Sequence, residues 1–141
     1  MDRDPLSISA SALAAQRQRL NVITENLANV NTTRMAGGGP YQRKVVRFES
    51  EGPGFASLLA GQPDATGGGV RVAGVSTVPG SIRVYHPGHP DADGNGFVEM
   101  PNVNPVVEMT DLMAATRAYE ANVSAIQAAK SMAQKALEIG R

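Results

Sequence analysis

The chain has 141 residues, enough for one domain with a modest core. Its 13 lysine and arginine side chains balance 13 aspartate and glutamate side chains, so there is no overall field to attract nucleic acid or an anionic membrane. The absence of cysteine excludes disulfides, thiolate metal sites and cysteine nucleophiles.

The beginning of the chain lacks the features of a cleaved secretory signal. Residues 1–5 contain no basic stretch followed by a continuous apolar segment. No run of 18 apolar residues occurs in the sequence, so we expect no membrane-spanning helix.

Residues 5–30 are predicted to form a first helix, about 40 Å long. Asp4 and Pro5 provide an N-cap residue followed by the residue type favoured at the first helical position. Residues 6–16 carry no ionisable side chain, and the asparagine-rich stretch 26–33 favours the end of the helix. Apolar residues recur at the spacing of a coiled-coil seam, a stripe of alternating three- and four-residue steps: Leu6, Leu13, Leu20, Ile23, Leu27 and Val30.

The middle of the chain has a different composition. Glycines 37–39 and Pro40 end the helical region, and short strands are predicted at residues 44–49, 70–78, 82–85 and 97–100. Residues 52–69 are glycine-rich and poor in apolar side chains, which is typical of a loop or linker. Strands this short bury too little apolar surface to fold alone. We therefore interpret them as a small β insertion that packs on the helices.

A second, longer helix is predicted from Asn104 to Ile139. Asn104 and Pro105 repeat the cap-then-proline start, and no further glycine or proline occurs until Gly140. The helix would be about 50 Å long, whereas a compact globule of this chain length is only about 35–40 Å across. We therefore expect an elongated molecule. The predicted seam consists of Leu112, Thr116, Tyr119, Val123, Ile126, Lys130, Ala133 and Leu137.

The two seams indicate the fold class. Each needs a partner, and the simplest arrangement pairs the two long terminal helices as a coiled coil, with short strands and loops between them. The expected fold is mainly α with a small β insertion (α+β). Its parts would be an N-terminal helix in residues 1–34, a glycine- and proline-rich insertion in 35–103, and a C-terminal helix in 104–141.

Both helices contain turns without charge on any face. Residues 6–16 and 121–129 have no ionisable side chain, although charged residues normally collect on the solvent side of a helix. One explanation is that neighbouring subunits cover these turns. The alternative is a central helix of an ordinary bundle. Arg117 and Glu120 lie three residues apart and are expected to form an ion pair, within the chain or with a neighbouring subunit.

A calcium loop is the strongest candidate for a metal site. Asp91, Asp93, Asn95 and Gly96 match its first, third, fifth and sixth positions, but Asn102 occupies the twelfth, where a bidentate glutamate is required. An Asx- and glycine-rich turn leading into the strand at 97 explains the same residues. We therefore predict no metal ligand here.

Zinc binding and catalysis have less support. His86 and His89 lack a third ligand. The sequence contains no nucleophile elbow and no phosphate-binding loop with its lysine. We expect no catalytic residue, no cofactor and no enzymatic activity.

Two terminal signatures resemble those of bacterial flagellar axial (rod and hook) proteins. The first comprises residues 11–16, 19–22 and 26–29, and the second residues 115–122. In the middle, residues 39–41, 85–87, 89–90, 96–98 and 100–103 are similar to proximal rod proteins of the flagellar basal body. The resemblance extends from about residue 8 to the C-terminus.

This resemblance implies a structural subunit that polymerises through its terminal helices into the rod, the drive shaft that transmits torque across the periplasm. It implies export by the flagellar type III apparatus without a cleaved signal, and terminal helices that fold on assembly. The implied partners are other copies of the chain, other rod proteins, and the inner-membrane ring with its adaptor. The expected assembly interface comprises Leu13, Leu20, Ile23, Leu27, Asn29, Val30, Leu112, Arg117, Tyr119, Asn122, Val123, Ile126 and Leu137.

Two other functions are compatible with parts of the sequence. A small calcium- or ligand-binding module would be centred on residues 86–102. A cell-wall-directed enzyme would need a carboxylate with a raised pKa in a cleft, for which no candidate stands out in the sequence.

Overall fold

A computed structural model describes residues 5–52 and 68–139. The chain forms α1 (Pro5–Ala28), β1 (Arg43–Ser50), β2 (Val70–Val78), β3 (Ser81–Tyr85), β4 (Phe97–Pro101) and α3 (Pro105–Ile139). Two helices with small antiparallel sheets confirm the predicted α+β class. Most of the loop predicted at 52–69 lies outside the described residues.

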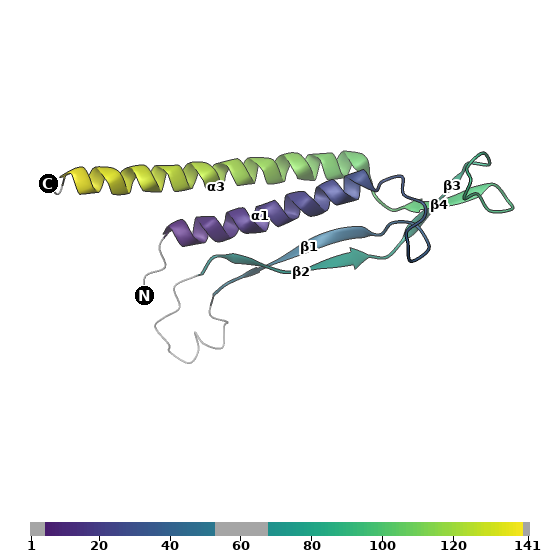
Figure 1. The fold of residues 1–141 in the computed structure, drawn as a ribbon, viewed down its shortest axis with the longest axis horizontal. Helices are drawn as coiled ribbons and strands as arrows, with labels where there is room; N and C mark the ends of the chain where they lie inside the picture. The colour runs from purple at the N-terminus through teal and green to yellow at the C-terminus, as the bar shows by residue number, and fades with distance from the viewer. Residues whose placement is uncertain (1–4, 53–67, 140–141) are drawn as a thin grey trace.

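The molecule is elongated, and α1, α3, β1 and β2 lie side by side along its long axis (Figure 1). α3 and α1 run antiparallel and in contact, and β1 and β2 pack against α1. α1 therefore lies between the longer helix and the first sheet. The end of α3 extends beyond the beginning of α1 (Figure 1). The prediction of an elongated molecule is confirmed.

Each sheet has two antiparallel strands. β1 pairs with β2 from Arg43 opposite Val78 to Ser50 opposite Val70, with Ala73 as an extra residue where the register shifts. Such a bulge increases the local twist of the pair. β3 pairs with β4, and this second sheet lies at the end of the molecule where α1 ends and α3 begins (Figure 1).

Side-chain caps define the two helix boundaries at this end. The Asn104 Oδ1 accepts hydrogen bonds from the amides of Val106 and Val107, at 3.0 and 3.4 Å, which confirms the predicted cap. α1 ends at Ala28, two residues before the predicted boundary. Asn29 causes this early end, because its side chain donates to the Glu25 carbonyl oxygen at 2.9 Å and its own carbonyl oxygen accepts from the Thr32 amide.

The buried core is small. The apolar residues described as buried are Ala15, Val22, Ile23, Tyr41, Val98, Val103 and Ala115. The accessible surface of the chain is 9841 Å², whereas a compact protein of this size exposes roughly 7,000 Å². Part of this surface is apolar, since large side chains such as Val106, Met113 and Ile139 are exposed.

The chain passes very close to α1 at Gly69, directly before β2. A Cβ atom at Gly69 would lie 1.9 Å from the Oγ of Ser11, and this hydroxyl also accepts a hydrogen bond from the Val70 amide at 3.1 Å. We expect Gly69→Ala to displace β2 from α1 and to lower the free energy of unfolding by about 1–3 kcal/mol. Urea denaturation measures the loss. Gly74→Ala is the matched control, because nothing lies within 4 Å of a Cβ there; equal effects of the two substitutions would contradict the prediction.

Candidate assembly interface

The predicted seam of α1 lies in contact with the rest of the chain. Ile23 is buried, and Leu13, Leu20 and Leu27 are half-buried. The sequence interpretation missed Ala15, Val22 and Asn26, which are also buried. Because α1 is covered by α3 and by the first sheet, its buried surface is wider than one stripe. Val22 and Ile23 are adjacent, so their side chains point in different directions from α1. This apolar pair was the sequence signal that a second side of α1 is covered.

Val30, the last residue of the predicted seam, does not lie on the helix. Val30 and Asn29 both follow the end of α1, in the turn that the Asn29 side chain stabilises, so the predicted helix end at residue 30 was wrong. Their side chains are half-buried in that turn.

The buried stripe of α3 differs from the predicted one at alternate positions. Leu112, Tyr119 and Ile126 are half-buried as expected. Ala115 is fully buried at 0% exposure, whereas the predicted Thr116 is exposed. Buried and half-buried residues of α3 include a stripe with alternating four- and three-residue steps: Glu108, Leu112, Ala115, Tyr119, Asn122, Ile126 and Ala129. Its first residue, Glu108, bonds to Asn26 of α1, the helix that packs on α3. A small side chain at 115 lets the two helices approach closely.

The remaining predicted residues of α3 lie apart from α1 or at its margin. Val123 is half-buried, Arg117 is exposed and Leu137 is 75% exposed. The expected ion pair between Arg117 and Glu120 is absent from the ion pairs of residues 5–52 and 68–139. Both side chains are exposed.

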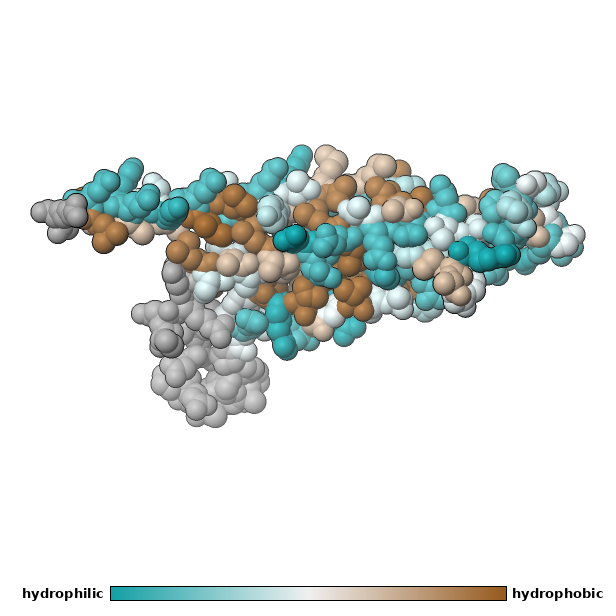
Figure 2. Space-filling model, in the orientation of Figure 1, coloured by the Kyte–Doolittle hydropathy of each residue, from teal (hydrophilic) through white to brown (hydrophobic). Residues whose placement is uncertain are grey.

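α3 carries apolar side chains on the side away from α1. Val106, Met109 and Met113 are exposed; at 100° per residue, Val106 and Met113 point away from Glu108 and Ala115, and Met109 points to the side. Every residue from 130 to 139, here named the arm, is exposed, including Met132, Leu137 and Ile139. Figure 2 shows apolar surface along the boundary between α1 and α3 and on the protruding end of α3.

The uncharged turns are only partly covered within the chain. In residues 6–16, Ala15 is buried while Ser7, Ile8, Ala10 and Ala14 are exposed. In residues 121–129, four residues that include Ile126 are half-buried and the other five are exposed. These exposed positions are surface that another molecule could cover.

A buried polar cluster holds the end of α1, the beginning of β1 and the beginning of α3 together. We name it the latch: Asn26, Tyr41, Arg43 and Glu108. The Glu108 carboxylate is only 1% exposed and accepts from Arg43 Nε at 2.6 Å and from Asn26 Nδ2 at 3.1 Å. Tyr41 Oη donates to Asn26 Oδ1 at 2.8 Å.

Hydrogen bonds to the backbone and two surrounding ion pairs extend the latch. Asn26 Nδ2 donates to the Lys44 carbonyl oxygen and Asn26 Oδ1 accepts from the Lys44 amide, both at 2.9 Å. Around it, Arg19 pairs with Asp111 at 3.3 Å, and Lys44 pairs with Glu25. Charged hydrogen bonds from three elements thus fix the register of α1 against α3.

Tyr41 gives the latch a dependence on alkaline pH. Burial raises the pKa of Tyr41 from 10.0 to about 12, with further contributions from the Glu25 and Glu108 carboxylates. Between these values the folded chain retains a proton that the unfolded chain has lost, so stability is expected to fall as pH rises from 10.0 to about 12. Tyr41→Phe should cost about 1 kcal/mol at neutral pH and flatten this decline. Urea midpoints at neutral and alkaline pH measure the difference; parallel declines would contradict it.

The segment that resembles a calcium loop in sequence forms a hydrogen-bonded turn. Asp93 Oδ1 accepts from the amides of Asn95 and Phe97, at 2.8 and 2.9 Å, which confirms the Asx turn. The hydrogen bond from the Phe97 amide is the main cause of a lowered pKa of Asp93. The hydrogen bond from the Asn95 amide and the Arg83 guanidinium lower this pKa further. Asp91 instead pairs with Arg34 and accepts from Thr33 Oγ1 at 2.8 Å.

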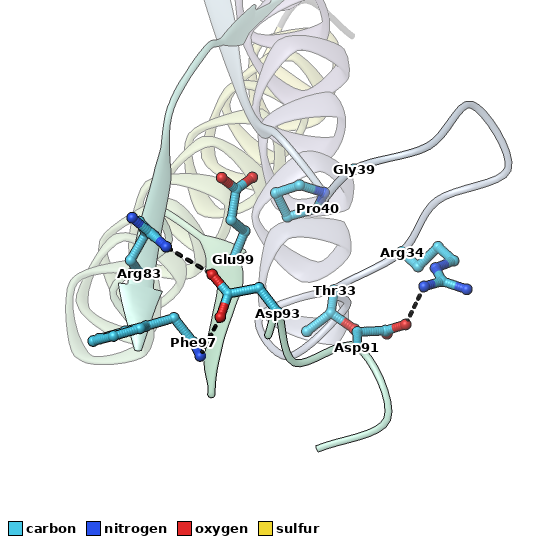
Figure 3. Close-up of a pocket in the computed structure, with 9 residues that line it drawn as sticks. All are labelled: Thr33, Arg34, Gly39, Pro40, Arg83, Asp91, Asp93, Phe97 and Glu99. Atoms are coloured by element: carbon cyan, nitrogen blue, oxygen red, sulfur yellow. Dashed lines mark hydrogen bonds and ion pairs between the residues drawn. The ribbon is translucent and has the colours of Figure 1, made fainter. Parts of the chain in front are cut away.

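A hollow of about 290 Å³ lies between these two carboxylates (Figure 3). Arg83 reaches Asp93 and Arg34 reaches Asp91, so each carboxylate has a cation of its own (Figure 3). The residues that the structure describes include no group of three or more His, Cys, Asp or Glu placed to hold a metal ion. The imidazoles of His86 and His89 stack edge to face, and His89 Nδ1 accepts from the Asp91 amide.

Within residues 5–52 and 68–139, neither helix is long and apolar enough to cross a membrane.

Comparison with known proteins gives consistent similarities. Residues 6–34 match the family described as "Flagella basal body rod protein", and residues 95–139 match "Flagellar basal body rod FlgEFG protein C-terminal". The chain is 46% identical to the flagellar basal-body rod protein FlgC of Bacillus subtilis, over 96% of both chains. It is 44% identical to FlgC of Salmonella typhimurium and 40% identical to FlgC of Borreliella burgdorferi, in each case over 95% of this chain and 94% of the relative.

Proposed function

The chain belongs to the FlgC family of flagellar basal-body rod proteins, and from this premise we propose how its helices build the rod. It is a structural subunit of the basal-body rod and assembles with other rod proteins. The single observation that carries the finer proposal is the uncharged, partly exposed surface of both helices. Covering such surface with another apolar surface lowers the free energy, and extended patches of this kind mark interaction sites.

We propose that α1 and α3 pair as an antiparallel coiled coil, which forms the part of the subunit that packs into the rod. The stripe of α3 with alternating four- and three-residue spacing, from Glu108 to Ala129, supports this pairing. The N-terminal helix (1–34) and the C-terminal helix (104–141) would form the axial core, and residues 35–103 the insertion that braces it.

The proposed interface keeps the residues expected from the sequence, with different roles. Leu13, Leu20, Ile23, Leu27, Leu112, Tyr119, Asn122, Val123 and Ile126 would hold the helix pair together and present its flanks to neighbours. Arg117 and Leu137 are exposed and would meet neighbouring subunits directly. Asn29 and Val30 would act by fixing the turn after α1.

Load would pass between subunits through these packed helices, which is how the rod would transmit torque. Family membership supports further proposed partners: the inner-membrane ring with its adaptor at the base of the rod, and the flagellar type III export apparatus. We propose no enzymatic activity. A calcium-binding module gains no support from the geometry, because Asp91 and Asp93 already have arginine partners.

Thiol labelling tests whether neighbours cover the uncharged turns, since the chain has no cysteine of its own. Ser124→Cys places a thiol in an exposed position of the uncharged turn 121–129, and Ser81→Cys places one on exposed β3 as the matched control. We expect the thiol introduced by Ser124→Cys to react rapidly in the free subunit and slowly in isolated basal bodies, while the control reacts rapidly in both. Equal reactivity of Ser124→Cys in the two states would overturn the proposal.

A further inference from the structure

The segment between β3 and β4 contains Asn95 followed by Gly96, and no other asparagine of the chain precedes a glycine. Asparagine before glycine is prone to spontaneous deamidation, because glycine has no side chain to hinder the approach of its backbone nitrogen to the asparagine carboxamide. The reaction needs no enzyme, metal or cofactor. It replaces a neutral side chain with a charged one and lengthens the backbone in part of the molecules.

The fold requires glycine at position 96. Its φ is +81°, a conformation that other residues rarely adopt. A Cβ atom there would also lie 2.9 Å from Tyr85 Cε2 and 3.2 Å from Pro87 Cβ. A bulkier residue, which would slow deamidation, therefore cannot follow Asn95 without displacing the end of the hairpin.

The Asn95 side chain is open to the reaction. It is exposed, and its carboxamide has no hydrogen-bond partner within residues 5–52 and 68–139. No contact of the described chain thus holds this carboxamide away from the backbone nitrogen of Gly96. Any restraint on the reaction must come from the backbone.

Asp93 restrains the backbone on both sides of the Asn95–Gly96 bond. Its carbonyl oxygen accepts a hydrogen bond from the Gly96 amide at 2.9 Å, which closes a β-turn. Its carboxylate Oδ1 accepts from the amides of Asn95 and Phe97 at 2.8 and 2.9 Å. Arg83 bonds to the other carboxylate oxygen at 2.8 Å and orients the group (Figure 3).

We propose that Asn95 is a site of spontaneous deamidation and that the hydrogen bonds of Asp93 keep this reaction slow in the folded chain. Hydroxide removes the Gly96 amide proton, and the nitrogen forms a bond to Cγ of Asn95. The Cγ–Nδ2 bond breaks, and the nitrogen leaves as ammonia after taking a proton from water. A second water molecule opens the cyclic imide, which leaves aspartate or isoaspartate at position 95. This inference is independent of the proposed assembly function.

The folded turn opposes the first step in two ways. The Gly96 amide proton is held by the Asp93 carbonyl oxygen, so base removes it less readily. The bonds to the Asp93 carboxylate also fix the backbone of Asn95, which must rotate before the Gly96 nitrogen can reach Cγ. The turn must therefore open locally before the imide can form.

Either product would disturb this end of the hairpin. Aspartate places a second negative charge beside Asp93. Isoaspartate adds a methylene group to the backbone directly before Gly96, whose carbonyl oxygen accepts from the His86 amide at 2.8 Å. The adjoining pair of β3 and β4, Tyr85 opposite Phe97, would lose its register.

Incubation of the full-length chain in mildly alkaline buffer, followed by peptide mapping with mass spectrometry, measures conversion at each asparagine. Asn95 is expected to react at least about tenfold more slowly in the folded chain than in the chain unfolded in urea, because the turn must open first. Asn102 is the internal control, because it is exposed but precedes Val103. Equal rates at Asn95 in the folded and unfolded chain, or conversion of Asn102 as fast as that of Asn95, would overturn the proposal.

Variants assign the protection to Asp93. Asp93→Ala removes its three side-chain hydrogen bonds and should accelerate deamidation of Asn95 at least about tenfold. Arg83→Gln leaves the two amide bonds in place and should accelerate it less. Asp91→Ala is the matched control, because Asp91 pairs with Arg34 and not with the turn, and should leave the rate unchanged.

Circular dichroism shows whether each variant keeps its helices, since the turn lies at the end of the molecule beyond the packed helix pair (Figure 1). Acceleration in a fully helical Asp93→Ala chain supports the proposal. An unchanged rate in Asp93→Ala, or equal acceleration in Asp91→Ala, would show that the Asp93 bonds are not the source of the protection.

Discussion

Replacing Glu108 with alanine is expected to lower the free energy of unfolding by about 3 kcal/mol, because it removes one partner of a buried ion pair. Arg43 Nε would lose its acceptor at 2.6 Å, and Asn26 Nδ2 would lose one of its two acceptors. The lower part of the usual range applies because the Arg43 side chain is 30% exposed and water can reach it. Urea denaturation followed by circular dichroism measures the loss.

Asp111→Ala is the matched control for this substitution. Asp111 lies on the next turn of α3, pairs with Arg19 at 3.3 Å and lies 4.0 Å from Arg43, the partner of Glu108. Its side chain is 36% exposed, so solvent screens both pairs. Its removal should cost at most about 1 kcal/mol. If the two substitutions had the same effect, burial of the Glu108 carboxylate would not be the source of its contribution.

Placing a carboxylate in the proposed helix pairing is expected to abolish motility through failed incorporation into the rod. Ile126→Asp alters α3 within its uncharged turns, and Leu20→Asp alters the opposing helix, and both side chains are half-buried in the single chain. A charge there would lose hydration without gaining a partner, which costs several kcal/mol in a fully covered site. Swimming in soft agar and the composition of isolated basal bodies measure the effect in a strain with no other copy.

Two further variants isolate the effect of a charge on the helices. Ile126→Val keeps the apolar contact and should swim normally. Gly88→Asp adds the same charge in an exposed loop where nothing lies within 4 Å of a Cβ, and should be incorporated. Normal assembly and swimming of Ile126→Asp would contradict the proposal that the helix pair forms the assembly core.

Local chemistry made the helices and strands predictable. The cap at Asn104 and the proline after it define where α3 begins, and side-chain bonds of Asn29 end α1. The strands follow short runs of β-branched residues between glycine and proline turns. The Asx turn at Asp93 was likewise readable, because a carboxylate two residues before an amide bonds to it without help from the rest of the chain.

The candidate interface was only partly predictable. Periodicity identified Leu112, Tyr119 and Ile126, but it favoured Thr116 over Ala115. A step of three residues from Leu112 leads to Ala115 and a step of four leads to Thr116, so periodicity allows either residue to be buried. The antiparallel helix packs closely at this point, which favours burial of the smaller alanine side chain. The latch had no sequence signal, since Arg43 and Glu108 are 65 residues apart.

By itself the sequence determined two long capped helices, a glycine-rich β insertion between them, uncharged turns that water does not favour, and the flagellar rod family. These features depend on neighbouring residues and on composition, so they can be read along the chain. Only the tertiary structure decided which side of each helix is buried, which carboxylate is enclosed with an arginine, and how far α3 extends past α1. These depend on contacts between segments far apart in the chain, and a local pattern leaves such contacts open.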